Sequence, residues 1–153
     1  MSIRDDLNTV LKESLKAKDQ VSMSTIRLIN AAVKDRDIAE RSNGNSEGIE
    51  DAAILSLMQS MVKQRQESAK TYAENDRPEL AEREQAEIVV IERFLPQQMS
   101  EEEMGAAIEK IIADTGAQDI KDMGKVMGQL KSQYAGQLDM AKAGGTVKAK
   151  LAG

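Results

Sequence analysis

The spacing of apolar residues along the chain predicts helices throughout. Near the amino terminus, Ile3, Leu7, Val10, Leu11 and Leu15 recur at steps of three and four residues. That spacing places the five side chains on one face of an amphipathic helix. A first helix with this face buried is therefore expected.

Two longer helices are predicted next. Asp19 is a suitable N-cap for a second helix that runs to about Arg41, and the polar, turn-forming stretch 42–48 then forms a loop. A third helix is expected from about Glu50 to Asn75. The expected buried residues of the two helices are Ile26, Ile29, Ala32 and Val33, then Ile54, Met58, Met61, Val62, Ala69 and Tyr72.

A fourth helix is predicted between two prolines. It is expected to begin at Asp76 or Arg77, because Pro78 is tolerated in a first turn. It is expected to end at Pro96, because a proline is poorly tolerated inside a helix. Its expected inner face consists of Leu80, Ile88, Ile91 and Leu95.

A fifth helix begins with a capping-box pattern. Ser100 can cap it while Glu103 reaches back, and the helix is expected to stop near Gly116. Its expected buried residues are Met104, Ala107, Ile108, Ile111 and Ile112.

Two further helices are expected near the carboxy terminus. Asp119 or Asp122 opens the sixth helix, and Gly136 closes it. Asp139 is expected to cap a seventh helix. This helix is expected to be weaker, because two adjacent glycines in it each cost about 1 kcal/mol. The expected inner residues are Met123, Val126, Met127, Leu130 and Tyr134, then Met140, Val147 and Leu151; the two glycines are Gly144 and Gly145.

These elements predict an all-α protein in two parts. An N-terminal four-helix unit, residues 1–96, is followed by a small three-helix C-terminal domain, residues 97–153. The second part is close to the smallest size that folds independently.

Composition narrows the chemistry. The 153 residues include no Cys, no His and no Trp, which removes thiolate chemistry, the most common general base and the most common zinc ligand. No Asp-rich loop with a turn glycine suggests a calcium or magnesium site. No catalytic residue, cofactor or metal is therefore expected.

The amino terminus is charged from Arg4 onward and no apolar run approaches about 18 residues, so a signal peptide and a membrane span are not expected. These features predict a cytoplasmic protein. The net charge of −5 argues against indiscriminate binding to nucleic acid or membranes.

The charge is unevenly distributed along the chain. Residues 1–99 carry 14 basic and 18 acidic side chains, whereas the stretch from Ala117 onward carries six lysines and three acids. The lysines form either a patch that contacts phosphates or an ordinary solvated face, and charge alone leaves both open. The six candidate nucleic-acid-binding residues are Lys121, Lys125, Lys131, Lys142, Lys148 and Lys150.

Arg65 interrupts the apolar stripe of the third helix. An unpaired buried guanidinium is very costly, so it requires a carboxylate partner, and Glu84 and Glu87 lie on the next helix. We favour an interhelical ion pair that fixes the register of the two helices. The alternative is a ligand site.

Gly124 and Gly128 lie four residues apart on the sixth helix. We favour close approach of a neighbouring helix, because glycine has no side-chain bulk. The alternative is a smooth face that an RNA backbone can approach.

Three ordered stretches of the chain resemble the YqeY family of small cytosolic proteins. The first is the stretch 63–68, KQRQES; the second begins with Arg77 and Pro78 and ends at Phe94-Leu95-Pro96; the third is 121–127, KDMGKVM. Each motif alone is weak, but the ordered set is specific and covers nearly the whole chain. Arg65, Arg77, Glu84, Glu87 and Gly124 are the structural or family-motif residues in these stretches.

The resemblance implies an amino-terminal helical bundle and a tail domain. That tail is similar to the carboxy-terminal domain of the B subunit of the glutamine-dependent tRNA amidotransferase, and similar domains are attached to some glutaminyl-tRNA synthetases. In those larger proteins the domain contacts tRNA. Members of the family are often labelled carbon–nitrogen ligases with glutamine as amide donor. One departure is Phe94, where the family usually has tyrosine; a hydrogen bond from a hydroxyl is not expected there, while the packing of the ring is.

Three functions follow as hypotheses. Amide transfer needs a nucleophile with a base and a phosphate-binding site, and the sequence offers neither pattern. The favoured hypothesis is an accessory module without autonomous catalysis that binds tRNA, or associates with a tRNA amidotransferase or aminoacyl-tRNA synthetase. The alternatives are a carbon–nitrogen ligase that acts within a complex, and a protein–protein adaptor. The oligomeric state is left open.

Overall fold

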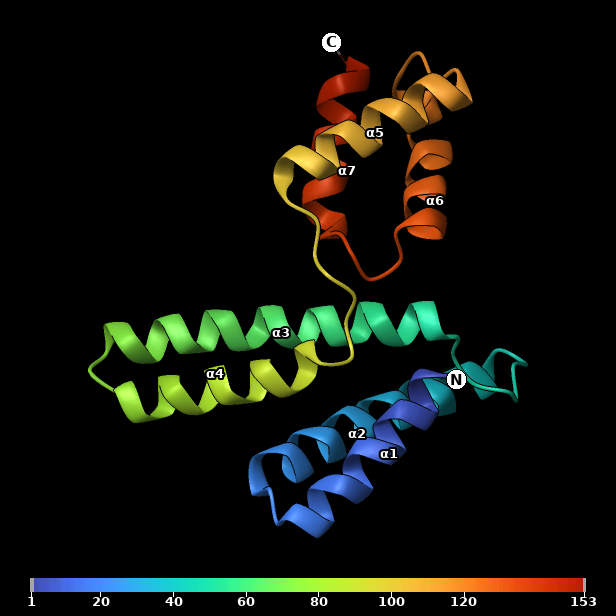
Figure 1. Ribbon diagram of the computed structural model, residues 1–153. Helices are drawn as coiled ribbons and strands as arrows, with labels where there is room; N and C mark the ends of the chain where they lie inside the picture. The colour runs from blue at the N-terminus through green and yellow to red at the C-terminus, as the bar shows by residue number, and fades with distance from the viewer. Residues whose placement is uncertain (1, 153) are drawn as a thin grey trace. The chain divides into compact units, whose positions relative to one another are not determined.

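The structure, a computed structural model, describes residues 2–152 and is all-α, as the sequence predicts (Figure 1). It contains seven α-helices and one 3-10 helix, and none of the described residues forms a strand. The chain divides between Leu95 and Pro96 into two compact units, here called the N-terminal and the C-terminal unit. Within residues 2–152 no helix has the length and apolar character to cross a membrane.

Two helical hairpins make up the N-terminal unit. In Figure 1, α1 and α2 run antiparallel as one hairpin, and α3 and α4 form the other. Asp19 caps α2 as predicted: its Oδ1 accepts a hydrogen bond from the Ser22 backbone N–H at 3.1 Å. The helices span Ile3–Ala17 (α1), Gln20–Ser42 (α2), Asp51–Glu74 (α3) and Pro78–Glu92 (α4).

The core of the N-terminal unit follows the predicted stripes with one exception. Leu15, expected inside, is 47% exposed. Its neighbour Ser14 is buried instead, and the Ser14 hydroxyl donates a hydrogen bond to the carbonyl of Val10 at 2.8 Å, which removes the cost of burying it. The fully buried large side chains of this core are Leu7, Ile26, Ile29, Ile54, Met58 and Ile91.

The fourth helix ends earlier than predicted, at Glu92. Beyond it, the N–H groups of Phe94 and Leu95 donate to carbonyls three residues back, a tighter turn than the α-helix. Pro96 contributes in two ways: it has no N–H to donate to the Glu92 carbonyl, and it disfavours α conformation in Leu95. Phe94 and Leu95 still pack against the core.

Three α-helices and a short 3-10 helix form the C-terminal unit. Ser100 and Glu103 make both capping-box hydrogen bonds, each at 3.1 Å, and Gly116 ends α5 in the left-handed conformation. Both candidate openings of the sixth helix are used, because Asp119 caps η1 and Asp122 precedes α6. The elements are Glu101–Thr115 (α5), Ile120–Asp122 (η1), Met123–Gln133 (α6) and Met140–Ala152 (α7).

The seventh helix forms over 13 residues in spite of its glycines. Asp139 caps it as predicted, accepting from the N–H groups of Ala141 and Lys142 at 2.9 and 3.3 Å. Val147 and Leu151 are buried against α5 and α6, and this burial outweighs a glycine cost of about 1 kcal/mol each. The same core contains Met104, Ile108, Ile111, Val126, Leu130, Ala143 and the unpredicted Leu138.

Candidate nucleic-acid interface

One exposed face of η1 and α6 combines glycines with lysines. Residues separated by three, four or seven positions lie on the same side of a helix. The opposite side of α6 carries buried residues such as Val126 and Leu130, so this side faces solvent. We call it the glycine–lysine face; its members are Lys121, Gly124, Lys125, Gly128 and Lys131, and all five are exposed.

The two glycines of this face contact no neighbouring helix. A Cβ atom placed on Gly124 or Gly128 would meet nothing within 4 Å. The close helix–helix approach that we favoured from the sequence is therefore wrong. Packing does not require glycine at either position, although each glycine costs the helix roughly 1 kcal/mol relative to alanine.

Short polar caps position the first turn of this face. The Asp119 carboxylate accepts from the Lys121 backbone N–H at 2.9 Å, and the Asp122 carboxylate accepts from the Gln118 N–H at 3.0 Å. The hydrogen bond from Gln118 is the main cause of a lowered pKa for Asp122, with smaller contributions from the lysines at 125 and 121. Both carboxylates thus bind backbone, and neither forms an ion pair with a lysine of the face.

The structure divides the six candidate lysines into two groups. Lys142 lies 3.9 Å from Glu101, and Lys150 donates a hydrogen bond to Glu109 at 2.8 Å. That hydrogen bond lowers the pKa of Glu109. The four others are exposed and form no ion pair within residues 2–152: Lys121, Lys125, Lys131 and Lys148.

Lys148 lies on the side of α7 that is turned toward α6. It follows Gly144 by one helical turn, and a Cβ atom on Gly144 would come 3.8 Å from the terminal methyl groups of Met123 and Met127. These methionines belong to α6. Lys148 therefore lies one helical turn from the point where α7 contacts α6.

Arg65 makes the ion pair that the sequence predicts. Its Nε lies 2.9 Å from Oε2 of Glu87, and its Nη1 donates to the Met61 carbonyl at 3.2 Å. Both charged side chains are only 13% exposed. The pair joins α3 to α4, so its geometry matches a contact that fixes helix register.

The other motif residues of the N-terminal unit have no such contact. Glu84 is half-buried on α4, and the described part of the chain offers it no ion pair. Arg77 is exposed at the N-cap of α4 and makes no capping hydrogen bond with its side chain. Among residues 2–152, no three side chains of the metal-binding types gather at one place.

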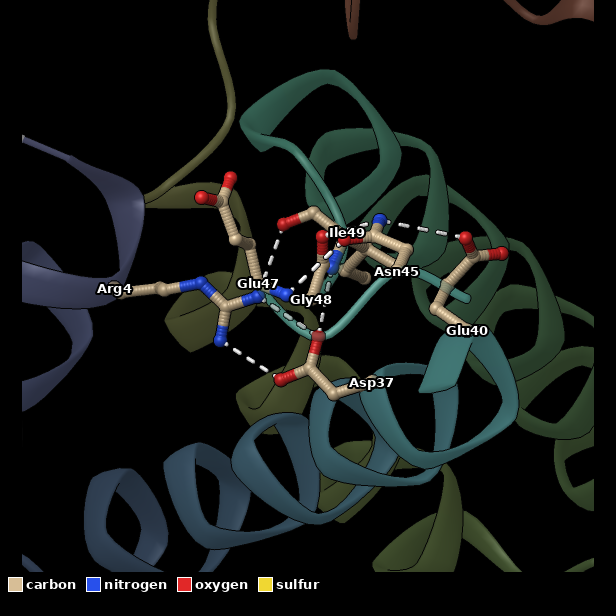
Figure 2. A network of polar contacts seen from close by, with 7 residues as sticks. All are labelled: Arg4, Asp37, Glu40, Asn45, Glu47, Gly48 and Ile49. Atoms are coloured by element: carbon tan, nitrogen blue, oxygen red, sulfur yellow. Dashed lines mark hydrogen bonds and ion pairs between the residues drawn. The ribbon is translucent and has the colours of Figure 1, made fainter. Parts of the chain in front are cut away.

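A polar network that sequence reasoning missed closes one end of the N-terminal unit (Figure 2). Nη1 and Nη2 of Arg4 each donate to one oxygen of Asp37 at 2.9 Å, and Nη2 also donates to the Ile49 carbonyl at 2.9 Å. The Ile49 N–H donates to Asp37 Oδ1 at 2.8 Å. The network ties the first turn of α1 to α2 and to the loop before α3.

The electrostatics of this network favour the charged forms. The hydrogen bond from Arg4, followed by that from the Ile49 N–H, lowers the pKa of Asp37, and the same carboxylate raises the pKa of Arg4. The sequence contained one signal, Gly48 in the polar loop, whose φ of +92° few other residues adopt. The partners Arg4 and Asp37 are too far apart in the chain for spacing to reveal them.

The comparisons with known proteins match most of the chain. The model of the family described as Yqey-like protein matches residues 4–151. The chain is similar to "Altered inheritance of mitochondria protein 41, mitochondrial" of Lachancea thermotolerans, with 28% identity over 71% of this chain and 57% of the relative. The protein of the same name from Kluyveromyces lactis is 28% identical over 93% of this chain and 72% of the relative.

A third relative of that name, from Meyerozyma guilliermondii, is 36% identical over 58% of this chain and 46% of the relative. The matches thus span about half the length of the first relatives. All three names contain the word mitochondrial, so a cytoplasmic location for this chain stays a prediction.

Proposed function

The chain belongs to the family of Yqey-like proteins, and we propose that its C-terminal unit binds the phosphate backbone of folded RNA, tRNA foremost, as an accessory module without catalysis of its own. The observation that carries this proposal is the glycine–lysine face. Two exposed glycines that packing does not require stand beside lysines that form no ion pair within residues 2–152.

Each part of the face suits a phosphate backbone. Glycine leaves the helix surface bare, so another chain can come close to it. Exposed lysine ammonium groups can bind phosphates as point charges without reading base sequence. Tyr134, the aromatic residue of the C-terminal unit, is half-buried in its core, which supports contact with backbone and shape over stacking on bases.

Binding of total tRNA, measured by fluorescence anisotropy at low and moderate salt, tests the proposal. The double variant Lys125→Gln/Lys131→Gln is expected to weaken binding and to reduce the slope of log affinity against log salt by roughly 0.7–0.9 per lysine. The control is Lys110→Gln, which removes the same charge from an exposed position of α5. A wild-type chain that binds no tRNA at low salt, alone or with amidotransferase subunits, would refute the proposal.

The family resemblance also directs attention to a larger assembly. We propose that the module works beside a tRNA amidotransferase or an aminoacyl-tRNA synthetase, whose related domains contact tRNA. Copurification from native extract, with and without ribonuclease, distinguishes association through bound RNA from direct protein–protein contact. A partner that is retained after ribonuclease treatment would instead favour a protein–protein adaptor.

A further inference from the structure

A shallow groove lies between α5 and α7 in the C-terminal unit. It is open to solvent, has a volume of about 740 Å³, and is lined by residues of α5 and α7 and by none of α6. Small residues and one methionine line it, and its two lysines are eight residues apart along α7. The lining consists of Met104, Gly145, Thr146, Ala149, the two lysines Lys142 and Lys150, and the acid Glu101.

The groove is open because α7 carries little side-chain bulk on this side. A Cβ atom on Gly145 would meet nothing within 4 Å, so packing leaves room there for a larger residue. Ala149 follows one turn later. This side of α7 therefore resembles the exposed side of α6: it has room for larger side chains, and its bare surface allows another chain to approach the helix.

Both lysines of the groove are held by acids of α5. Lys150 Nζ lies 2.8 Å from Glu109 Oε1, and Lys142 Nζ lies 3.9 Å from Glu101 Oε1. The two acids are 70% and 85% exposed, so water screens both pairs. Pairs of this kind are weak, and a phosphate can replace the carboxylate at small cost.

We propose that the α5–α7 groove is a second contact for the backbone of bound RNA, in which phosphates replace Glu101 and Glu109 on Lys142 and Lys150. The inference rests on the proposed function and adds a site to it. Eight helical residues span about 12 Å, so the occupant must present anionic groups at intervals along a slim chain. A nucleic-acid backbone does so, because it carries one phosphate at every nucleotide.

Replacing a competing acid tests this contact. Glu109→Gln is expected to tighten tRNA binding about two- to fivefold, the range that corresponds to loss of one exposed ion pair. The matched control is Glu102→Gln, which removes the same charge from an exposed residue of α5 that holds no lysine. The gain from Glu109→Gln over the control is expected to vanish in a Lys150→Gln background, because the coupling runs through that lysine.

Filling the groove provides a second test. Gly145→Gln is expected to weaken tRNA binding without loss of helix content by circular dichroism, because its Cβ meets no neighbour. Ala106→Gln is the control, because Ala106 is an exposed residue of α5 and is outside the lining. Equal effects of the two substitutions would contradict the groove contact.

The outcomes separate the two proposals. A wild-type chain that binds no tRNA overturns both. Binding that responds to Lys125→Gln/Lys131→Gln, but equally to Glu109→Gln and Glu102→Gln, overturns the groove contact alone. Fluorescent polyglutamate serves as a second probe; if Glu109→Gln tightens polyglutamate binding and leaves tRNA binding unchanged, the groove binds an acidic polypeptide and the RNA assignment is wrong.

Discussion

Gly44 and Gly48 have nearly the same φ, +90° and +92°, but differ in surroundings. A Cβ atom on Gly44 would meet nothing within 4 Å, whereas one on Gly48 would lie 2.5 Å from Asp37 Oδ1 and 3.1 Å from Arg4 Nη2. Replacing either glycine with alanine forces a left-handed conformation on a residue that disfavours it, at about 1 kcal/mol. Only at Gly48 must the Arg4–Asp37 ion pair also move.

We therefore expect Gly48→Ala to destabilise the protein by about 1–3 kcal/mol more than Gly44→Ala does. Urea denaturation followed by circular dichroism measures the difference, and Gly44→Ala serves as the matched control. Equal losses for the two variants would show that the network adjusts freely and holds the loop only weakly.

The Arg65–Glu87 pair gives a second prediction at this scale. Arg65→Met leaves the mostly buried carboxylate of Glu87 without its main partner, so a loss of about 3 kcal/mol is expected. Arg65→Met/Glu87→Leu removes both charges and should recover most of that stability, because an apolar pair can replace a buried ion pair. Thermal and chemical unfolding measure both. An Arg65→Met protein that melts normally but no longer binds RNA would mean that Arg65 contacts a ligand.

At the scale of the element, substitutions of the glycines of α6 are expected to affect stability and the proposed tRNA binding in opposite directions. Alanine at Gly124 or Gly128 has room for its Cβ and improves helix propensity, so each substitution should raise stability by up to about 1 kcal/mol. Gly128→Gln should also keep or raise stability, yet weaken tRNA binding because its side chain covers the bare surface. Chemical unfolding and tRNA-binding anisotropy, measured on the same samples, test whether stability and affinity change in opposite directions. Glycine-to-glutamine changes that leave binding untouched would remove the main support for the face.

Helices α4 and α7 show how tertiary contacts adjust what local signals suggest. The two glycines of α7 predicted a weak helix, but Val147 and Leu151 anchor it in the core and the helix is complete. In α4, Pro96 supplies no N–H for the Glu92 carbonyl and disfavours α conformation in Leu95, and the helix ends at Glu92. Local propensity therefore predicted where both helices lie. Core packing determined the length of α7, and Pro96 influenced the end of α4.

At the scale of the whole molecule, acid is expected to weaken both units. The pKa values of Asp19 and Asp37 in one unit and of Glu109 and Asp122 in the other are lowered by hydrogen bonds. A carboxyl whose pKa is lower in the folded state contributes stability above its ordinary pKa, near 4, and loses that contribution as the pH falls through the lowered pKa.

Asp37 provides the variant for this prediction. Asp37→Asn is expected to be less stable than the wild type by about 1–3 kcal/mol at pH 7, because it loses the charged hydrogen bonds with Arg4. The difference should shrink as the pH falls below 4 and the wild-type carboxyl takes up a proton. Urea titrations at pH 7 and pH 2.5 test this. A constant difference across that range would assign the effect of the substitution to shape and not to charge.

The sequence by itself determined the helices, their caps and most of the buried stripes. Ser100 with Glu103, Asp19 and Asp139 act within one turn of the residues they cap, and apolar spacing is a local property of each helix. The Arg65–Glu87 pair could be predicted for a related reason, since a buried charge on a known stripe requires an acid on the adjoining helix.

Only the tertiary structure decided which charges meet and which surfaces stay bare. Arg4 and Asp37 are 33 residues apart, and Lys150 and Glu109 are 41 apart, so no local spacing connects them. The spacing of Gly124 and Gly128 is also the same whether a neighbouring helix or solvent covers them. The packing of α5, α6 and α7 decides that they are exposed. Local order follows from backbone propensity and periodicity, whereas long-range pairing depends on how the helices pack in three dimensions.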